Sequence, residues 1–408
     1  MEKKRIIALP PWLESLETRA VLSALTDAPR TVRFVGGCVR DTLLGRPVTD
    51  LDIATTLKPS DVIYHLQKAN IKTVPLGLEH GSVLAVTGSY HYEITTLRHD
   101  IETDGRHAKV NFTDNWKEDA KRRDFTFNAL YLSIKGELYD PWGGEEDLQK
   151  GRVRFIGDAS ERIQEDYLRI LRYFRFYASY GQGETDAEAL ESCKKYAAKI
   201  KNLSAERIHT EILKLLKAPL PLYALQKMEE TGVWFHAMQG APSPDIKQLE
   251  TLIKLEQEFH IMPKALRRLA AILKDNGNAL HILSKELKFS HKEKKELESL
   301  VKLAGHLCMD SRELLYEHGL ETTLDVLLLQ VAQGYNRILL EQLPLSWEKP
   351  VFPLSGEDLK TLGIAPGPLF GKILKHVETW WVKQHFAPEA TQCLEEARKY
   401  SQSFTSHS

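Results

Sequence analysis

The spacing of apolar residues divides the chain into two parts. Up to residue 157, short strand-like runs at 31–35, 50–55, 82–88 and 91–98 alternate with short helical patterns. From residue 158 onward, apolar residues recur every three or four positions, which is typical of helices. This order predicts an α+β protein, with a small mixed sheet and flanking helices followed by an all-α arm.

Other segments of the chain set the expected boundaries. Residues 99–115 are polar and show no period, which predicts a long loop, and 153–159 reads as the last strand. Residues 12–25 and 159–181 each read as one continuous helix, and a Pro/Gly-rich stretch follows residue 345. We therefore expect a catalytic head over 1–157, a helical neck over 158–220, an RNA-binding helical body over 221–345 and a helical tail over 346–408.

Composition limits the kinds of partner, metal site and cellular compartment to be expected. The chain of 408 residues carries a net charge of −1, so a polyanionic partner would be bound by local Lys/Arg patches. Cys38, Cys193, Cys308 and Cys393 form no CxxC pair, so neither a zinc site nor a disulfide framework is expected. No run approaches about 18 uncharged apolar residues. We expect a cytoplasmic protein without a membrane span, and the sequence leaves its oligomeric state open.

Two aspartates stand one residue apart in the apolar run at 50–55. Alternate side chains of a strand point the same way, so Asp50 and Asp52 share a face and form a hard-oxygen site suited to Mg²⁺. Two metal ions there would serve phosphoryl transfer. Glu93, inside the run at 91–98, is a candidate third carboxylate. The alternatives are exposed aspartates on an edge strand or turn, and an edge-strand charge at Glu93.

Gly36 and Gly37 lie directly between a strand and a helix. Glycine allows close approach of the backbone, and free N–H groups at a helix start suit phosphates. Arg40, on the first turn of the helix, could reach the same phosphates. A tight turn without a ligand is the alternative.

The helix pattern after residue 164 carries Asp166, Arg169, Arg172 and Arg175. Asp166 accepts hydrogen bonds and Arg169, its near neighbour on a helix, only donates them. This pair matches the Watson–Crick edges of cytosine and adenine, whereas guanine and uracil would leave polar groups unmet at about 1–3 kcal/mol each. The alternative is an i,i+3 salt bridge on a solvated face.

A second polar group precedes these arginines. Arg123, Asp124 and Asn128 lie in "KRRDFTFNALYL". Asp124 and Asn128 are four residues apart and would share a face if the segment were helical. A carboxylate and an amide there could bind ribose hydroxyls. The alternative is a helix cap at Asp124 with Asn128 at the surface.

Taken together, these motifs resemble those of the class II tRNA nucleotidyltransferase (CCA-adding enzyme) and bacterial poly(A) polymerase family, part of the polymerase β-like superfamily. The matching segments are "GGCVRD", "DLD", "RRDFTFNAL", "DPWGGEEDL" and "EDYLRILRYFRF". The resemblance is strong from about residue 31 to 178 and weaker along the helical arm. It implies a polymerase β-like head followed by an elongated helical arm that holds tRNA.

The resemblance also implies roles for the matched positions. Asp50 and Asp52 would bind the catalytic Mg²⁺ ions, and residues 98–115 would hold a flexible loop that matters for adding the terminal A. Gly37, Arg40 and Arg123 would contact the nucleotide, chiefly its phosphates, and Asp124 would contact the ribose. Asp166 and Arg169 would select CTP and then ATP, and Arg172 and Arg175 would assist at the base or phosphates.

The implied activity is metal-dependent addition of C, C and A from CTP and ATP to the tRNA 3′ end, with release of pyrophosphate. A poly(A) polymerase and a CC-only or A-only tRNA nucleotidyltransferase are alternatives, although the presence of the 98–115 segment disfavours a CC-only enzyme. A non-catalytic RNA-binding module is a further alternative. Basic clusters at Lys194–Lys195, Lys199–Lys201 and Lys292–Lys295 are candidate phosphate contacts on the arm.

Overall fold

The computed structural model describes residues 5–26, 31–88, 90–103, 108–183, 185–273, 277–305, 311–344, 346–364 and 367–405. The chain forms two compact units, the first over 1–246 and 274–289 and the second over 247–273 and 290–408. These units do not follow the four domains expected from the sequence, whose limits stay a prediction. No helix in the described part of the chain is long and apolar enough to cross a membrane.

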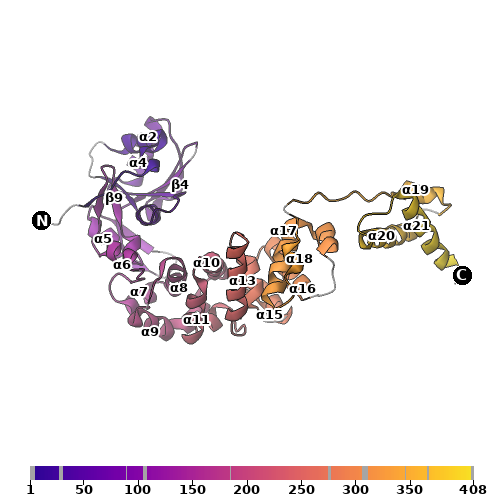
Figure 1. The fold of residues 1–408 in the computed structure, drawn as a ribbon. Coiled ribbons are helices and arrows are strands. Elements are labelled where there is room, and N and C mark those ends of the chain that lie inside the picture. The colour runs from indigo at the N-terminus through magenta and orange to yellow at the C-terminus, as the bar shows by residue number, and fades with distance from the viewer. Residues whose placement is uncertain are drawn as a thin grey trace. The chain divides into compact units, whose positions relative to one another are not determined.

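An eight-stranded mixed sheet organises the N-terminal half of the first unit (Figure 1). Its order is β1-β10-β9-β2-β3-β6-β5-β4, and β3 and β6 are parallel while the other neighbours are antiparallel. The hairpin expected from 82–98 is confirmed as β5 and β6. The strands are β1 (Arg5–Ile6), β2 (Val32–Val35), β3 (Leu51–Thr55), β4 (Lys72–Gly77), β5 (Ser82–Val86), β6 (His91–Thr96), β9 (Tyr131–Ser133) and β10 (Glu137–Tyr139).

Short helices flank this sheet. α2 and α4 pack against each other, and α4 also contacts β4, β5 and β6. The helix expected over 12–25 is divided at Ser15, whose hydroxyl accepts a hydrogen bond from the Thr18 N–H and so caps the second half. The helical elements here are α1 (Pro11–Glu14), α2 (Leu16–Leu25), α3 (Gly37–Leu43), α4 (Pro59–Lys68), η1 (Leu78–His80), α5 (Trp116–Lys121), η2 (Thr126–Asn128) and α6 (Gly144–Gln149).

Two expectations about strands and loops were wrong. Residues 99–115 do not form one long loop, because β7 (Arg98–Thr103) and β8 (Ala108–Phe112) pair as an antiparallel ribbon. Part of the expected loop, residues 104–107, lies outside the described residues. Residues 153–159 form no strand; Phe155 makes only an isolated bridge with Phe125. Polar strands of a two-stranded ribbon lack the apolar alternation that would have revealed them.

The rest of the first unit is helical. The continuous helix expected over 159–181 is two helices, because the chain is extended at Asp166 (φ −154°, ψ 108°). The elements are α7 (Ala159–Glu165), α8 (Leu168–Tyr180), α9 (Ala187–Tyr196), η3 (Ala197–Asn202), α10 (Ala205–Lys217), α11 (Pro221–Glu230), α12 (Val233–Ala237) and α15 (Gly277–Glu286).

An aromatic cluster joins α8 to the sheet domain. The segment 124–128 begins in an extended conformation, so Phe125 and Phe127 enter the core while polar residues alternate with them. The Phe125 ring lies 5.3 Å from Phe176 and 6.4 Å from Tyr173, between ring centroids, and Phe127 lies 5.4 Å from Phe176. Large buried rings of this kind dominate core energetics. The cluster therefore fixes α8 against the residues that follow Arg123.

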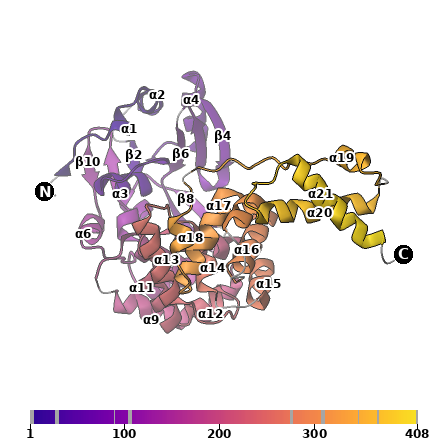
Figure 2. The same ribbon diagram turned by 45° about the vertical axis from the view of Figure 1, so that its right-hand side comes forward.

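The second unit is all-helical. Its centre holds a buried charge network in which Arg267 donates to Glu256 (2.6 Å) and Asp325 (2.6 Å), and Arg268 also donates to Glu256. α20 and α21 lie side by side around Ile373, Val377 and Trp381 (Figure 2). The elements are α13 (Ile246–Glu258), α14 (Ala265–Ile272), α16 (His291–Ala304), α17 (Ser311–Ala332, interrupted at Gly319), α18 (Ile338–Glu341), α19 (Gly356–Thr361), α20 (Pro368–Lys383) and α21 (Ala390–Thr405).

Gly144 offers a test of how α6 supports η2. A Cβ built at Gly144 would lie 2.2 Å from the Thr126 carbonyl oxygen, so the G144A variant must move one backbone segment. We expect a loss of about 1–3 kcal/mol in the free energy of unfolding, measured by urea denaturation. G371A in α20 is the control, because its Cβ meets open space. Equal stability of G144A and the wild type would contradict this packing.

Candidate active site

One cavity of about 380 Å³ in the first unit gathers most of the residues that the sequence singled out. Asp50, Glu93 and Arg175 are not among the residues that line it. Phe176 lines it and was not foreseen. The lining residues are Gly36, Gly37, Arg40, Asp52, Arg123, Asp124, Asn128, Asp166, Arg169, Arg172 and Phe176.

The glycine turn connects β2 to α3 and lines the cavity. Gly36 has φ 72° and ψ −124°, a backbone conformation that favours glycine. A Cβ at Gly36 would lie 3.6 Å from both Arg123 Nη1 and the Asn128 carbonyl oxygen. The turn therefore lies directly against the side chain of Arg123, and little could be added to it without narrowing the cavity.

Asp52 lies in β3, next to Glu93 of the parallel strand β6. Its neighbours Leu51 and Ile53 are buried in the core, so the carboxylate projects from the other face. Burial raises the pKa of Asp52 to about 6, Glu93 and Asp50 add to the rise, and Arg123 and Arg40 oppose it. Asp50 is exposed, directly before the strand, and accepts a hydrogen bond from the Thr49 hydroxyl (3.3 Å).

These carboxylates fit a hard divalent cation. Asp52 is partly buried beside two other carboxylates whose charges disfavour its ionisation, and a bound cation would remove that penalty. Oxygen donors of this kind suit Mg²⁺, which needs few carboxylates. Among the described residues, however, no group of three or more His, Cys, Asp or Glu side chains is arranged to hold a metal. The structure thus does not gather Glu93 with Asp50 and Asp52 into a three-carboxylate site.

Asp124 and Asn128 are brought together without the helix that their spacing suggested. The intervening residues form the 3₁₀ turn η2, and Asn128 Nδ2 donates to Asp124 Oδ1 (2.9 Å). Arg40 Nη1 donates to Asn128 Oδ1 (2.7 Å), and Arg172 Nε donates to Asp124 Oδ2 (2.6 Å). Burial disfavours ionised Asp124, but Arg172 and Asn128 outweigh it and bring the pKa of Asp124 to about 2.

Asp166 and Arg169 both line the cavity but do not form the i,i+3 salt bridge weighed as their alternative. Asp166 Oδ1 accepts from the Leu168 N–H (3.0 Å) at the start of α8, and Asp166 Oδ2 accepts from Arg207 Nη2 (2.7 Å). Arg169 Nη1 pairs with Glu165 and donates to the Arg162 carbonyl oxygen (2.7 Å). Each side chain is thus held by a different neighbour.

Arg175 lies outside the cavity lining. Its Nε donates to Glu211 Oε2 (2.5 Å), and its guanidinium lies 3.9 Å from the centroid of the Phe176 ring. Sequence reasoning missed Arg207 and Glu211, both on α10. Glu211 is buried on the apolar face of α10 with Ile208 and Ile212, and a carboxylate at such a position was a readable signal of a buried partner.

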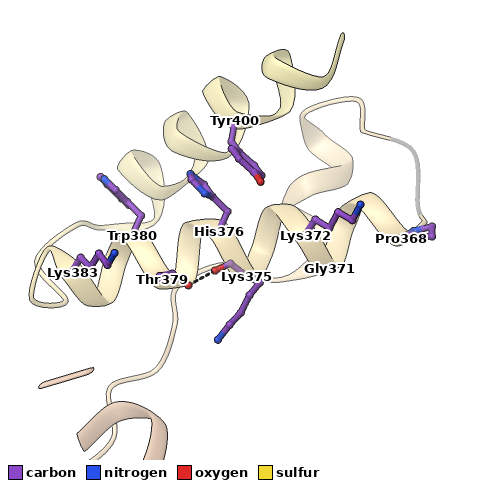
Figure 3. A pocket seen from close by; sticks show the side chains of 9 residues that line it. All are labelled: Pro368, Gly371, Lys372, Lys375, His376, Thr379, Trp380, Lys383 and Tyr400. Atoms are coloured by element: carbon purple, nitrogen blue, oxygen red, sulfur yellow. Dashed lines mark hydrogen bonds between the residues drawn. The ribbon is translucent and has the colours of Figure 1, made fainter. Parts of the chain in front are cut away.

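A second cavity, of about 810 Å³, lies along α20 in the second unit (Figure 3). None of the residues singled out by the sequence lies there. The His376 and Tyr400 rings stack at 3.6 Å between centroids, and His376 Nε2 lies 3.3 Å from Glu396 Oε1. The lining residues are Pro368, Gly371, Lys372, Lys375, His376, Thr379, Trp380, Lys383 and Tyr400.

Two family models match the chain. Residues 32–154 match the poly A polymerase head domain, and residues 184–241 match a probable RNA and SrmB-binding site of polymerase A. The first covers the glycine turn, Asp124 and every strand of the sheet except β1, and the second begins after α8. The residues that line the cavity from α8 therefore lie between the two matched regions.

Whole-chain relatives extend these matches. The chain is 37% identical to the mitochondrial CCA tRNA nucleotidyltransferase 1 of Danio rerio, over 89% of this chain and 86% of the relative. It is 31% identical to the CCA-adding enzyme of Bacillus cytotoxicus, over 88% and 92%. The crystal structure of the Bacillus stearothermophilus CCA-adding enzyme in complex with CTP is similar with a TM-score of 0.78 at 25% identity, over 98% of this chain and 100% of that one. With its cavity and these relatives together, the chain belongs to the CCA-adding tRNA nucleotidyltransferases and is an enzyme of that family.

Proposed function

We propose that this nucleotidyltransferase adds C, C and A, from CTP and ATP, to the 3′ end of tRNA. The supporting observation is that one cavity combines a carboxylate of the expected metal site, a glycine turn flanked by arginines, and the Asp166–Arg169 pair. These are the three parts that such a reaction needs: a reacting centre, a triphosphate cradle and a reader of the base. The relatives from Danio rerio and Bacillus carry the same activity in their names.

At the triphosphate end, Gly36 and Gly37 admit the phosphates close to the backbone, and Arg40 and Arg123 supply positive charge. Both arginines line the cavity, Arg123 beside Gly36 and Arg40 beside Gly37. Guanidinium groups bind phosphate oxygens with two parallel hydrogen bonds, which fixes orientation as well as charge. We assign the phosphates to this end.

At the base end, Asp166 offers an acceptor and Arg169 offers donors. Cytosine and adenine each present an amino donor beside a ring-nitrogen acceptor, which matches this pair. Because Asp166 accepts from Arg207 and Arg169 pairs with Glu165, both groups are already oriented before a nucleotide binds. Preorganised partners lose little entropy on binding, which favours selection. Arg172 lines the same cavity and donates to Asp124, and we assign it and Arg175, which is bonded to Glu211, a supporting role.

Asp124 and Asn128 also line the cavity, and we assign the ribose to them. Their side chains already bond each other, Arg40 and Arg172, so a ribose hydroxyl would join an existing network. These polar groups would bind a 2′-hydroxyl, which CTP and ATP carry and deoxynucleotides lack. This is the basis of the ribonucleotide preference that we propose.

The family depends on divalent metal, and we propose Mg²⁺ held by Asp50 and Asp52, with Glu93 as an additional nearby carboxylate. Bound there, Mg²⁺ would favour the deprotonated 3′-hydroxyl and neutralise charge on the phosphates. The 3′-oxygen of the tRNA attacks the α-phosphorus, the bond to the β-phosphate breaks, and pyrophosphate leaves. Positioning and charge stabilisation by Arg40, Arg123 and the glycine turn carry most of the catalysis.

Basic side chains along the helical units would hold the tRNA backbone. Lys194, Lys195, Lys199 and Lys201 are exposed on α9 and η3, and Lys292 and Lys295 are exposed on α16. Three further lysines, Lys372, Lys375 and Lys383, line the cavity along α20. Phosphate contacts of this kind give affinity that falls with salt and does not read sequence.

Substrate range decides among the related activities. A purified preparation is offered tRNA ending before CCA, with CTP alone, ATP alone or both, and the products are sized on gels. The proposal requires two additions with CTP and one further addition with ATP. Repeated A addition would indicate a poly(A) polymerase, and a product stopping at CC would indicate a CC-adding enzyme.

The cytoplasmic location also stays a prediction, since the Danio rerio relative is named mitochondrial.

The D50A/D52A double variant tests the metal assignment. Loss of both carboxylates removes the proposed metal ligands, so turnover should fall by about a thousandfold or more while the fold is retained. Initial rates of CTP incorporation measure the effect. D61A, which removes an exposed carboxylate from the first turn of α4, is the control. Turnover that survives the double change would remove Asp50 and Asp52 from the mechanism.

The D166A variant tests base selection. Removing the acceptor should relax the preference for C and A over U and G by about tenfold, the value of one unmet polar group. Misincorporation of UTP and GTP is measured under single-turnover conditions. D158A removes the cap of α7, close in sequence, and should lower stability without changing fidelity. Unchanged fidelity in D166A would contradict the templating assignment.

A further inference from the structure

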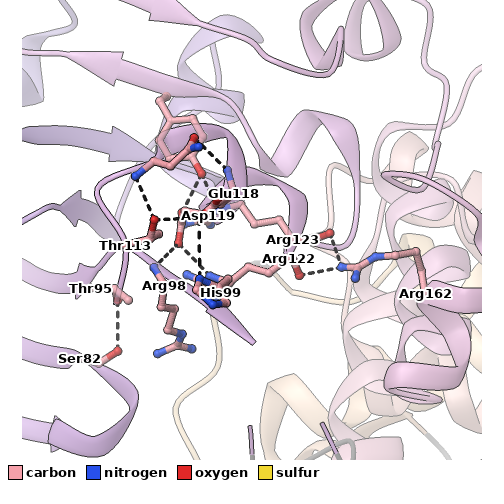
Figure 4. A network of polar contacts seen from close by, with 12 residues as sticks. Ser82, Thr95, Arg98, His99, Thr113, Glu118, Asp119, Arg122, Arg123 and Arg162 are labelled. Atoms are coloured by element: carbon pink, nitrogen blue, oxygen red, sulfur yellow. Dashed lines mark hydrogen bonds and ion pairs between the residues drawn. The ribbon is translucent and has the colours of Figure 1, made fainter. Parts of the chain in front are cut away.

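Asp119, on α5, is a buried carboxylate that does not line the cavity but contacts Arg123, which does. Its side chain is 1% exposed, and its two oxygens face different partners (Figure 4). Oδ1 accepts from Arg122 Nε (2.8 Å) and from the Arg98 backbone N–H (3.4 Å) in β7. Oδ2 accepts from Arg123 Nη2 (3.3 Å) and the Tyr131 hydroxyl (2.7 Å). Oδ1 is thus bonded toward the β7 ribbon, and Oδ2 is bonded to Arg123, which lines the cavity.

Two nitrogens of the Arg123 guanidinium are hydrogen-bonded to the protein, and the third lies beside the glycine turn. Arg123 Nε donates to the Tyr131 hydroxyl (3.2 Å), which in turn donates to Asp119, so Nε and Nη2 are both tied to the same carboxylate. Nη1 is the nitrogen beside Gly36. The guanidinium therefore presents Nη1 toward the glycine turn, where the triphosphate is proposed to bind.

The backbone around Arg123 is also fixed. Arg162 Nη2 donates to the carbonyl oxygens of both Arg122 and Arg123, at 2.7 Å each (Figure 4). These bonds hold the main chain but leave the long Arg123 side chain free to change rotamer. Asp119 and Tyr131 are the groups that restrict that side chain.

The charge of Asp119 is part of this restraint. Burial opposes its ionisation, but Arg123 and Arg122 outweigh burial and bring the pKa of Asp119 to about 2. The carboxylate is therefore ionised at any working pH. An asparagine has the same shape but only one acceptor oxygen. It could accept from the donors now bonded to Oδ1 or from those bonded to Oδ2, but not from both groups.

We propose that Asp119 is a positioning residue for nucleotidyl transfer, which holds Arg123 in the orientation that receives the nucleotide triphosphate. The inference rests on the proposed function, because the triphosphate is the ligand that Arg123 would meet. Asp119 itself touches no substrate. It acts through Arg123, directly at Nη2 and through the Tyr131 hydroxyl at Nε.

Steady-state kinetics of CTP addition to tRNA ending before CCA tests the proposal. D119N should raise KM for CTP by about tenfold with a smaller change in kcat, because a mobile arginine pays for its ordering each time a nucleotide binds. R122Q is the matched control: it removes an ion pair from the same carboxylate, at the oxygen facing away from Arg123. R122Q should leave KM unchanged.

A double-mutant cycle separates positioning from general destabilisation. If Asp119 acts through Arg123, D119N should add no further rise in KM in an R123Q background, so that D119N/R123Q equals R123Q. Additive effects, or an equal rise in KM for R122Q, would overturn the proposal. Should D119N fail to fold, Y131F removes the bridging hydroxyl with little change of shape and should raise KM in the same direction; unchanged KM in Y131F would then overturn it.

The wild type keeps this test distinct from that of the proposed function. If the wild-type enzyme adds no C to the primer, the proposed function fails whatever the variants do. If it adds C, C and A but D119N behaves as R122Q does, the positioning role alone fails.

Discussion

The ion pair between Asp124 and Arg172 is the interaction on which the site depends. Asp124 follows α5 in the sheet domain and Arg172 lies on α8, 48 residues later, yet Arg172 Nε lies 2.6 Å from Asp124 Oδ2. The other oxygen of Asp124 accepts from Asn128, which accepts from Arg40 of the glycine turn. The glycine turn and α8 are therefore linked through a single buried carboxylate.

Such pairs are costly to leave half-formed. Removing one partner of a buried ion pair typically costs about 3–5 kcal/mol, because the remaining charge stays buried without compensation. The site contains several such pairs, because Asp124, Asp119 and Glu211 each bind at least one arginine beside the cavity. The same low dielectric that makes an unpaired charge costly strengthens each bond that is made. The arginines are accordingly oriented before any nucleotide arrives.

Asp52 stands apart from these carboxylates. Asp124 and Asp119 have arginine partners that bring the pKa of each down to about 2, whereas burial and two neighbouring carboxylates raise the pKa of Asp52 to about 6. The protein therefore stabilises the negative charge of Asp124 and Asp119, and it disfavours that of Asp52. A paired carboxylate positions its partner, while one whose charge the fold disfavours is suited to a cation or a proton.

The sequence by itself determined the α+β head, the helical arm and the residue types of the site. Alternation marked β3, β5 and β6, and local motifs marked the glycine turn, Asp52, Asp124 and Asp166, because period and turn chemistry are properties of neighbouring residues. Only the tertiary structure decided which charges pair. The bonds of Asp166 to Arg207, Arg175 to Glu211 and Asp119 to Arg123 depend on where separate elements pack. It also paired residues 98–103 with 108–112 as a ribbon, because strand pairing is settled by contacts distant in sequence. The helix is broken at Asp166, whose side chain accepts from the nearby Leu168 N–H and from the distant Arg207.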